Sequence, residues 1–329
     1  MAASSRVGLV LGAGGLLGSA WMIGALPSLA ERIGRPLGDL ELLVGTSAGS
    51  VLAAALRCGM TVDELVAHQR GEPVDGVPEP RRLERETGDG LPPLPYPWIG
   101  SPRLLARTAT SPWKVRPLVA ATSVFPVGRA RMPSLVHFLG SVQRRIGITE
   151  DRWVPGPPVW IPTVDYDTGR RVVFGRAGAP PSTLAEAVQA SCAIPGWMAP
   201  QVIGGRRYVD GGVASVTSVD LLARDVRRGL ELDQVYVLAP LASHDYDRPF
   251  APFTRIERGV RVLLTGQVDR EVRALRETGV EVKVITPGPE DLAAFGFNVM
   301  NPRRRLRVLE TSLRTSARRA AEAETVDAA

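Results

Sequence analysis

Cysteine and histidine are both scarce in this 329-residue sequence. Its two cysteines, Cys58 and Cys192, are too few for the disulfide framework of a small secreted protein, so they fit a reducing compartment. There are three histidines, and no cluster of histidine, cysteine and aspartate has the spacing of metal ligands. We therefore expect no metal site.

Long hydrophobic runs are also missing. The longest apolar stretch, residues 9–26, contains five glycines and no uninterrupted segment long enough to span a bilayer. The first residues lead directly into a strand-like segment and lack the apolar core of a signal peptide. The expected location is the cytoplasm, with attachment to the surface of a membrane left open.

Lysine is nearly absent, with Lys114 and Lys283 the two examples, although the net charge is +6 and the pI about 9.9. Arginine supplies the rest of the positive charge, and its planar group suits phosphate and carboxylate ligands. A bias in genome composition would produce the same skew. The basic surface is compatible with peripheral contact with an anionic membrane. The arginines are spread and no nucleic-acid motif is present, so we expect no nucleic acid partner.

The chain is rich in glycine, and its most informative segment is residues 45–49, Gly-Thr-Ser-Ala-Gly. A short apolar run of strand type precedes it, and a buried-helix pattern follows. Gly-x-Ser-x-Gly between a strand and a helix is the nucleophile-elbow motif, in which Gly45 and Gly49 relieve crowding around a strained, exposed Ser47. A glycine-rich turn that only caps a helix would give the same pattern.

A second glycine-rich turn comes earlier, between a buried-strand pattern at residues 7–11 and a helical pattern at residues 19–32. Its glycines are Gly12, Gly14, Gly15 and Gly18. Such a turn gathers backbone N–H groups that bind a phosphate, or an oxyanion that forms during a reaction. The dinucleotide fingerprint needs glycine at the sixth position, where this chain has Leu17. Acidic residues follow at Glu31 and Asp39, so a dinucleotide cofactor stays an alternative. The serine motif on the next strand counts against it, and we predict no cofactor.

Strand and helix patterns alternate through the rest of the chain, which indicates an α/β fold with a largely parallel sheet covered on both faces. Further strands are expected at residues 159–164, 171–174, 207–209, 235–238 and 280–285. Asp210 lies where one of these short strands meets the turn formed by Gly211 and Gly212, so its carboxylate projects from the sheet edge. Open α/β folds place their sites at this edge.

We expect a single domain over residues 6–325, interrupted by a proline-rich insertion at about residues 71–133. The insertion has no regular apolar period beyond short helices near residues 103–107 and 113–123. It contains Trp98, Trp113 and Phe125, which are compatible with a lid or an interfacial contact, or with anchoring of a loop to the core.

In their order and setting, the glycine-rich turn, the Ser47 motif and the Asp210 turn resemble the patatin-like phospholipases. Residues 190–196 and 297–302 are similar to the same family. The resemblance implies a three-layer α/β/α fold with a largely parallel central sheet. It also implies a serine acyl hydrolase of phospholipase A or lysophospholipase type that acts on lipids or other acyl esters.

For individual residues, the resemblance implies a Ser–Asp dyad without a catalytic histidine. Ser47 would attack the ester carbonyl, and Asp210 would accept its proton and later activate water. The oxyanion would be held by backbone N–H groups of the glycine-rich turn and of the residue after the serine. The implied oxyanion-hole residues are Gly12, Gly14, Gly15 and Ala48.

The sequence departs from the family at two places. Leu17 stands where the family's turn usually carries arginine or lysine, and Trp21 stands where many bacterial members have histidine. The missing basic side chain weakens the case for a phospholipid more than the case for a hydrolase.

Two alternatives remain at this stage. Ser47, Asp210 and His244 follow the chain order of the Ser-Asp-His esterases with an α/β-hydrolase fold. A non-catalytic, lipid-binding member of the same fold would keep the architecture and lack the chemistry.

Overall fold

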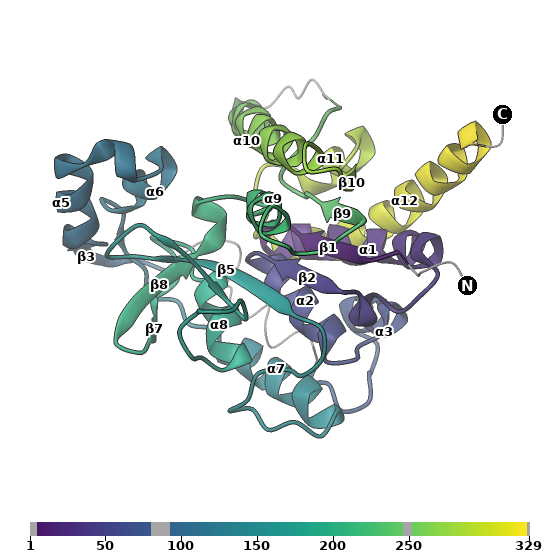
Figure 1. The fold of residues 1–329 in the computed structure, drawn as a ribbon, viewed down its shortest axis with the longest axis horizontal. Coiled ribbons are helices and arrows are strands. Elements are labelled where there is room, and N and C mark those ends of the chain that lie inside the picture. The colour runs from purple at the N-terminus through teal and green to yellow at the C-terminus, as the bar shows by residue number, and fades with distance from the viewer. Residues whose placement is uncertain (1–4, 80–92, 246–251, 328–329) are drawn as a thin grey trace.

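The computed structural model describes residues 5–79, 93–245 and 252–327 (Figure 1). Within these residues the main sheet has eight strands, in the order β10-β9-β1-β2-β5-β8-β7, with β6 paired to β5. The strands are β1 (Val7–Leu11), β2 (Leu42–Gly45), β5 (Val159–Asp165), β6 (Arg171–Phe174), β7 (Gln201–Ile203), β8 (Arg206–Asp210), β9 (Gln234–Leu238) and β10 (Glu281–Ile285).

Five neighbouring strands, from β10 to β5, are parallel, whereas β6, β7 and β8 are antiparallel to their partners. The prediction of a largely parallel sheet is therefore confirmed. All residues of β1 and β2 are buried, as expected of parallel strands that are covered on both faces.

Helices cover both faces of this sheet. They are α1 (Gly15–Ile33), α2 (Ala48–Arg57), α3 (Val62–Arg70), α7 (Pro133–Arg145), α8 (Leu184–Ser191), α9 (Asp220–Val226), α10 (Pro252–Arg276), α11 (Pro289–Phe295) and α12 (Arg305–Asp327). Alternate residues of β1 enter opposite cores: Leu9 and Leu11 pack with α1, α2 and α8, and Val10 packs with α9 and α10. The three-layer α/β/α arrangement is thus confirmed (Figure 1).

Residues 93–132 form a small lobe beside the β5–β8 end of the sheet (Figure 1). It contains α5 (Pro102–Thr110), α6 (Pro117–Thr122) and a two-stranded sheet of β3 (Tyr96–Ile99) and β4 (Pro126–Val127). The two helices were predicted and the two strands were not, because β3 is short, exposed throughout and interrupted by Pro97. The lobe is joined to the sheet by an apolar cluster that includes Leu104 and Tyr166.

Within the described ranges, no helix combines the length and hydrophobicity that crossing a bilayer requires. The single domain over residues 6–325 remains a prediction. The part of the insertion at residues 80–92 lies outside the described residues.

The start of α2 packs directly on the end of β1, and two glycines make this possible. A Cβ atom at Gly49 would overlap the carbonyl oxygen of Leu11. A Cβ atom at Gly45 would lie 2.6 Å from the Cα of Ser50. The spacing of the two glycines therefore lets the chain turn from β2 into α2 against β1.

We expect Gly49→Ala to destabilise the protein by about 2 kcal/mol or more, because the added methyl group meets rigid backbone. The measurement is urea unfolding followed by circular dichroism. Gly259→Ala is the matched control: Gly259 is an exposed residue of α10 with open space around its Cα, so alanine should stabilise by about 0.5–1 kcal/mol. Equal unfolding midpoints for the two variants would contradict the packing described here.

Candidate active site

Ser47 forms the turn between β2 and α2 in a conformation that is rare for a residue with a side chain. Its φ is 53° and its ψ is −123°, and Ser218 is the one other described non-glycine residue with positive φ. Such a conformation costs about 1–3 kcal/mol and persists where surrounding contacts enforce it. The strained turn that the sequence motif predicts is therefore present.

Hydrogen bonds hold this turn on both sides. The Ser47 N–H donates to Ser191 Oγ at 2.9 Å, and Ser191 Oγ donates to the carbonyl of Pro162 at 2.8 Å. The Thr46 N–H donates to the carbonyl of Leu11 at 3.0 Å. Ser191 is thus a positioning residue that connects the Ser47 turn to β5. This role could not be read from the sequence, although Ser191 lies within the family-like segment 190–196.

Asp210 ends β8 and is buried beside Ser47. Its Oδ1 accepts the N–H of Gly212 at 2.7 Å, and its own N–H donates to the carbonyl of Ala193 at 3.0 Å. Burial raises the pKa of its carboxyl to about 6, against lowering by hydrogen bonds from the Ser47 side chain and the Gly212 backbone. The structure therefore brings the two predicted dyad residues together.

Strand β5 determines how close Ser47 and Asp210 lie to each other. Near its start it pairs in parallel with β2, with Val44 opposite Trp160, and further along it pairs with β8, with Thr163 opposite Asp210. A Cβ atom at Gly211 would overlap the carbonyl of Pro162, so the residue after Asp210 must lack a side chain. The strand that carries the serine and the strand that carries the carboxylate are thus held by one common neighbour.

The glycine-rich turn lies against the Asp210 turn. A Cβ atom at Gly212 would lie 3.1 Å from the Cβ of Ala13, and one at Gly14 would lie 2.7 Å from the Cα of Gly18. The three motifs that the sequence analysis singled out therefore meet in space. Small residues are required at the points where their backbones touch.

The backbone N–H groups of the predicted oxyanion hole differ in their availability. The Gly12 N–H donates to the carbonyl of Leu238 at 2.9 Å, so it is already engaged. Among the described residues, the N–H groups of Gly14, Gly15 and Ala48 have no acceptor in the protein. Gly15 also has a positive φ of 59°, which turns the chain into α1. The structure thus leaves three of the four predicted donors unpaired.

Ser47 opens into a cleft of about 90 Å³ with a largely apolar wall. Gly15 and Ala48, two of the residues with unpaired N–H groups, line it together with Ser47. Much of the remaining wall comes from three methionines and three aliphatic residues, which are Met132, Met198, Met300, Val51, Leu135 and Ile194. Methionine side chains adapt to irregular apolar ligands. The cleft can therefore hold an apolar group against the Ser47 side chain.

Leu17 and Trp21 are both buried in the core. The Leu17 N–H donates to the carbonyl of Val299 at 2.8 Å, and its side chain is fully buried. The turn therefore provides no cation at the position where the resembling family usually has one.

His244 is placed elsewhere. Its Nε2 lies 2.9 Å from Oδ1 of Asp269 on α10, and it lines a surface cavity that shares no residue with the Ser47 cleft. The structure does not join His244 to the serine.

In the part of the chain that the structure describes, no group of three histidine, cysteine or acidic residues is arranged to hold a metal ion.

A comparison with protein-family models agrees with the site. Residues 159–223 match the model described as "Patatin-like phospholipase". This part of the chain is similar to the patatin-like phospholipase family. The match runs from the start of β5 into α9 and includes Asp210, Gly211 and Gly212, whereas Ser47 lies outside it. No curated protein sequence is similar enough to this chain to count as a match.

Solved structures of bacterial proteins show a distant likeness. VipD from Legionella pneumophila is 14% identical, with 94% of this chain and 68% of VipD covered and a TM-score of 0.43. The type III effector ExoU is 17% identical, with coverage of 97% and 53% and a TM-score of 0.38. ExoU of Pseudomonas aeruginosa in complex with SpcU is 16% identical, with coverage of 95% and 53% and a TM-score of 0.33. This chain spans about half the length of the ExoU chains. The TM-scores are too low for these structures to inform the function of this chain.

We expect Asp210→Asn to stabilise the folded protein at high pH. Burial raises the pKa of this carboxyl from 3.8 to about 6. At high pH the carboxylate is therefore buried in the folded state, whereas water solvates it in the unfolded chain. The resulting loss in the free energy of unfolding is fully present above pH 6 and disappears as the pH falls toward 4. The amide of the variant carries no charge and so avoids this loss, and the amide oxygen can still accept the Gly212 N–H.

Urea unfolding of both proteins measures this effect. At about 1.4 kcal/mol for each pKa unit, the variant should gain about 3 kcal/mol at pH 8 and about 1 kcal/mol at pH 4.5. An equal gain in the free energy of unfolding at both pH values would show that the pKa of the Asp210 carboxyl is not raised.

Proposed function

We propose that this protein is a serine acyl hydrolase that cleaves acyl esters of lipids with a Ser47–Asp210 dyad. The observation that carries the proposal is the position of a strained serine next to a buried aspartate, through the common neighbour β5 and beside unpaired backbone N–H groups. The apolar wall of the adjoining cleft supports a lipid acyl group as the part of the substrate that is bound.

In the first half of the reaction, Ser47 Oγ attacks the ester carbonyl as Asp210 takes the hydroxyl proton. The negative charge that develops on the carbonyl oxygen is stabilised by the N–H groups of Gly14, Gly15 and Ala48. When the tetrahedral intermediate collapses, Asp210 returns the proton to the departing alcohol, and the acyl group remains on Ser47.

In the second half, Asp210 removes a proton from water, which attacks the acyl-enzyme at the same carbonyl. The same N–H groups stabilise the second intermediate, and the proton passes to Ser47 Oγ as the fatty acid leaves. Removal of one oxyanion-hole donor in enzymes of this kind lowers kcat about 10²–10³-fold.

The shifted pKa of Asp210 supports its role as the base. An ordinary aspartate with a pKa near 4 is a weak base toward a hydroxyl group. Burial raises the pKa of Asp210 to about 6. At this pKa the carboxyl is still ionised at neutral pH, and it is a stronger proton acceptor than an ordinary aspartate. The triad alternative lacks comparable support, because His244 is paired with Asp269.

We expect Ser47→Ala and Asp210→Asn each to lower kcat/KM for p-nitrophenyl butyrate by about 10³-fold or more, since the two residues act as one unit. In the wild-type protein, kcat/KM should rise with pH through an apparent pKa of about 6, because the base must be deprotonated.

His244→Ala is the control for this experiment, and its activity should stay within about twofold of wild type. A fluorophosphonate probe should label the wild-type protein and the His244 variant but not the Ser47 variant. Loss of both labelling and activity in folded His244→Ala would favour the triad. An absence of labelling in folded wild-type protein would favour the non-catalytic member of the fold.

The proposal includes peripheral contact with an anionic membrane through the lobe. Residues 93–132 contain six arginine or lysine residues and no aspartate or glutamate. Two of the six, Arg103 and Arg116, face carboxylates on other elements. Nine of the sixteen large hydrophobic side chains that are exposed in the described ranges also lie in the lobe. Trp98 and Trp113 are 69% and 78% exposed. Exposed tryptophan beside positive charge is typical of surfaces that bind anionic lipid.

We expect the double variant Trp98→Ser, Trp113→Ser to bind phosphatidylglycerol vesicles about tenfold or more weakly than wild type, because two large apolar side chains are lost. Co-sedimentation with vesicles measures the binding. Leu263→Ser removes a side chain that is 74% exposed on α10 and should leave binding unchanged. Equal weakening by the two changes would refute the lobe as the membrane contact.

A further inference from the structure

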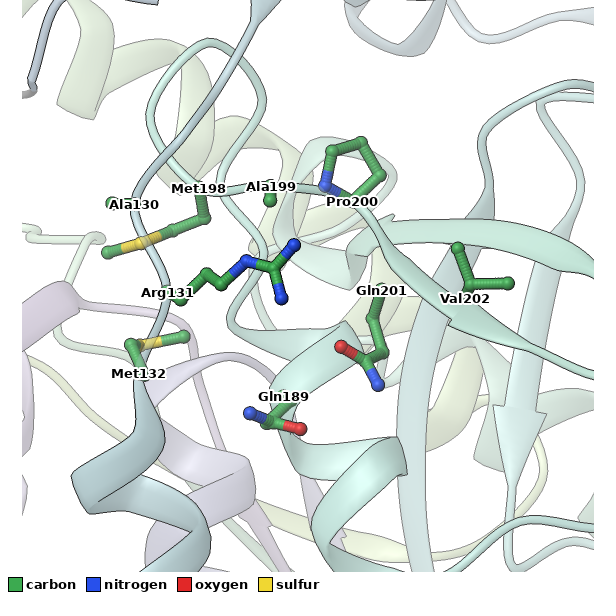
Figure 2. Close-up of a pocket in the computed structure, with 9 residues that line it drawn as sticks. All are labelled: Ala130, Arg131, Met132, Gln189, Met198, Ala199, Pro200, Gln201 and Val202. Carbon is green, nitrogen blue, oxygen red and sulfur yellow. The ribbon is translucent and has the colours of Figure 1, made fainter.

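A second cavity adjoins the Ser47 cleft and has a different chemical character. Its volume is about 380 Å³, within the range of about 300–1,000 Å³ typical of small-molecule sites. Figure 2 shows the side chains that line it, which come from the end of the lobe, from α8, and from β7 and the segment before it.

The two cavities share part of their wall. Met132 and Met198 line both, so a ligand in one space lies next to a ligand in the other. The backbone fixes this wall, because the Ala130 N–H donates to the carbonyl of Trp197 at 3.1 Å and the Ala199 N–H donates to the carbonyl of Ala130 at 2.9 Å.

Three polar side chains point into the second cavity. Figure 2 shows the guanidinium of Arg131 and the amides of Gln189 and Gln201 directed toward the same space. Among the described residues that line the cavity, Arg131 is the one with a charge.

The Arg131 guanidinium also has no ion-pair or hydrogen-bond partner in the described part of the chain. Its neighbour Arg129 differs, since its guanidinium lies 4.6 Å from the centre of the Tyr96 ring. Arg131 is thus left with its donors available at the wall of a cavity that contains no carboxylate.

We propose that this cavity holds the phosphate group of a phospholipid whose ester lies at Ser47. Arginine binds phosphate oxygens through two parallel N–H donors, and the glutamine amides add further donors. The inference rests on the proposed hydrolase function and specifies its substrate as an anionic phospholipid.

The shared wall of the two spaces fits such a substrate. In a glycerophospholipid the acyl ester and the phosphate are attached to one three-carbon unit, so their sites must be immediate neighbours. The apolar cleft takes the acyl chain and the Arg131 cavity takes the phosphate, with the methionine wall between them. The glycine-rich turn contributes no competing cation, because Leu17 is buried.

Short-chain substrates that stay monomeric test the inference without the influence of membrane binding. The pair is dihexanoyl-phosphatidylglycerol and dihexanoylglycerol, which differ by the head group. For Arg131→Gln we expect KM for the phospholipid to rise about tenfold or more, as for the loss of a charged hydrogen-bond donor. The kinetic constants for dihexanoylglycerol should change by less than about twofold.

Arg129→Gln is the matched control, because it removes the same charge two residues away without changing the cavity. It should leave the ratio of kcat/KM for the two substrates at the wild-type value. If Arg131→Gln and Arg129→Gln change this ratio equally, or if Arg131→Gln weakens both substrates equally, the inference is overturned.

Calorimetric binding to the Ser47→Ala protein separates this inference from the hydrolase proposal. Dihexanoyl-phosphatidylglycerol should bind, and adding Arg131→Gln should weaken it about tenfold or more. If the wild-type protein cleaves no ester but this binding depends on Arg131, the cavity assignment stands and the hydrolase proposal falls. Equally tight binding of glycerol 3-phosphate would assign the cavity to a free phosphate ester and overturn the lipid assignment.

Discussion

The pairing of β5 with both β2 and β8 is the constraint on which the candidate site depends. Ser47 and Asp210 are far apart in the chain, and neither the elbow nor the Asp-Gly-Gly turn determines where the other lies. Because Trp160 pairs with Val44 and Thr163 pairs with Asp210, the two turns leave the sheet at neighbouring points. This is also where the sheet changes from parallel to antiparallel pairing, so the change of direction itself creates the site.

The same arrangement explains how two unfavourable features are tolerated. A serine with positive φ and a buried, largely ionised aspartate both lower stability. Each is enforced by contacts from several elements: the Ser47 turn by Ser191 and by Gly49 against β1, and the Asp210 turn by Gly212 and Ala193. The stability that is lost at Ser47 and Asp210 is thus offset by the packing around them, a pattern that is common at functional sites.

Much of this could be predicted from the sequence, because buried strands, capping boxes and glycine turns are local signals. β1, for example, has the predicted bounds. What could not be predicted depends on distant contacts. The Gly12 N–H is engaged by Leu238, the positioning role of Ser191 needs β5 beside it, and Arg131 gains its importance from a cavity wall supplied by another part of the chain. Strands β3 and β7 were missed because they are short and partly or fully exposed, so that no apolar alternation marks them.

The lobe does not end as a free appendage. Its last residues continue along the loop that follows α8, where the N–H groups of Arg129 and Ala130 both donate to the carbonyl of Trp197, and Met132 and Met198 then form the rim of the Ser47 cleft. A shift of these residues relative to the loop after α8 would therefore move Met132 against Met198 and change the width of the cleft.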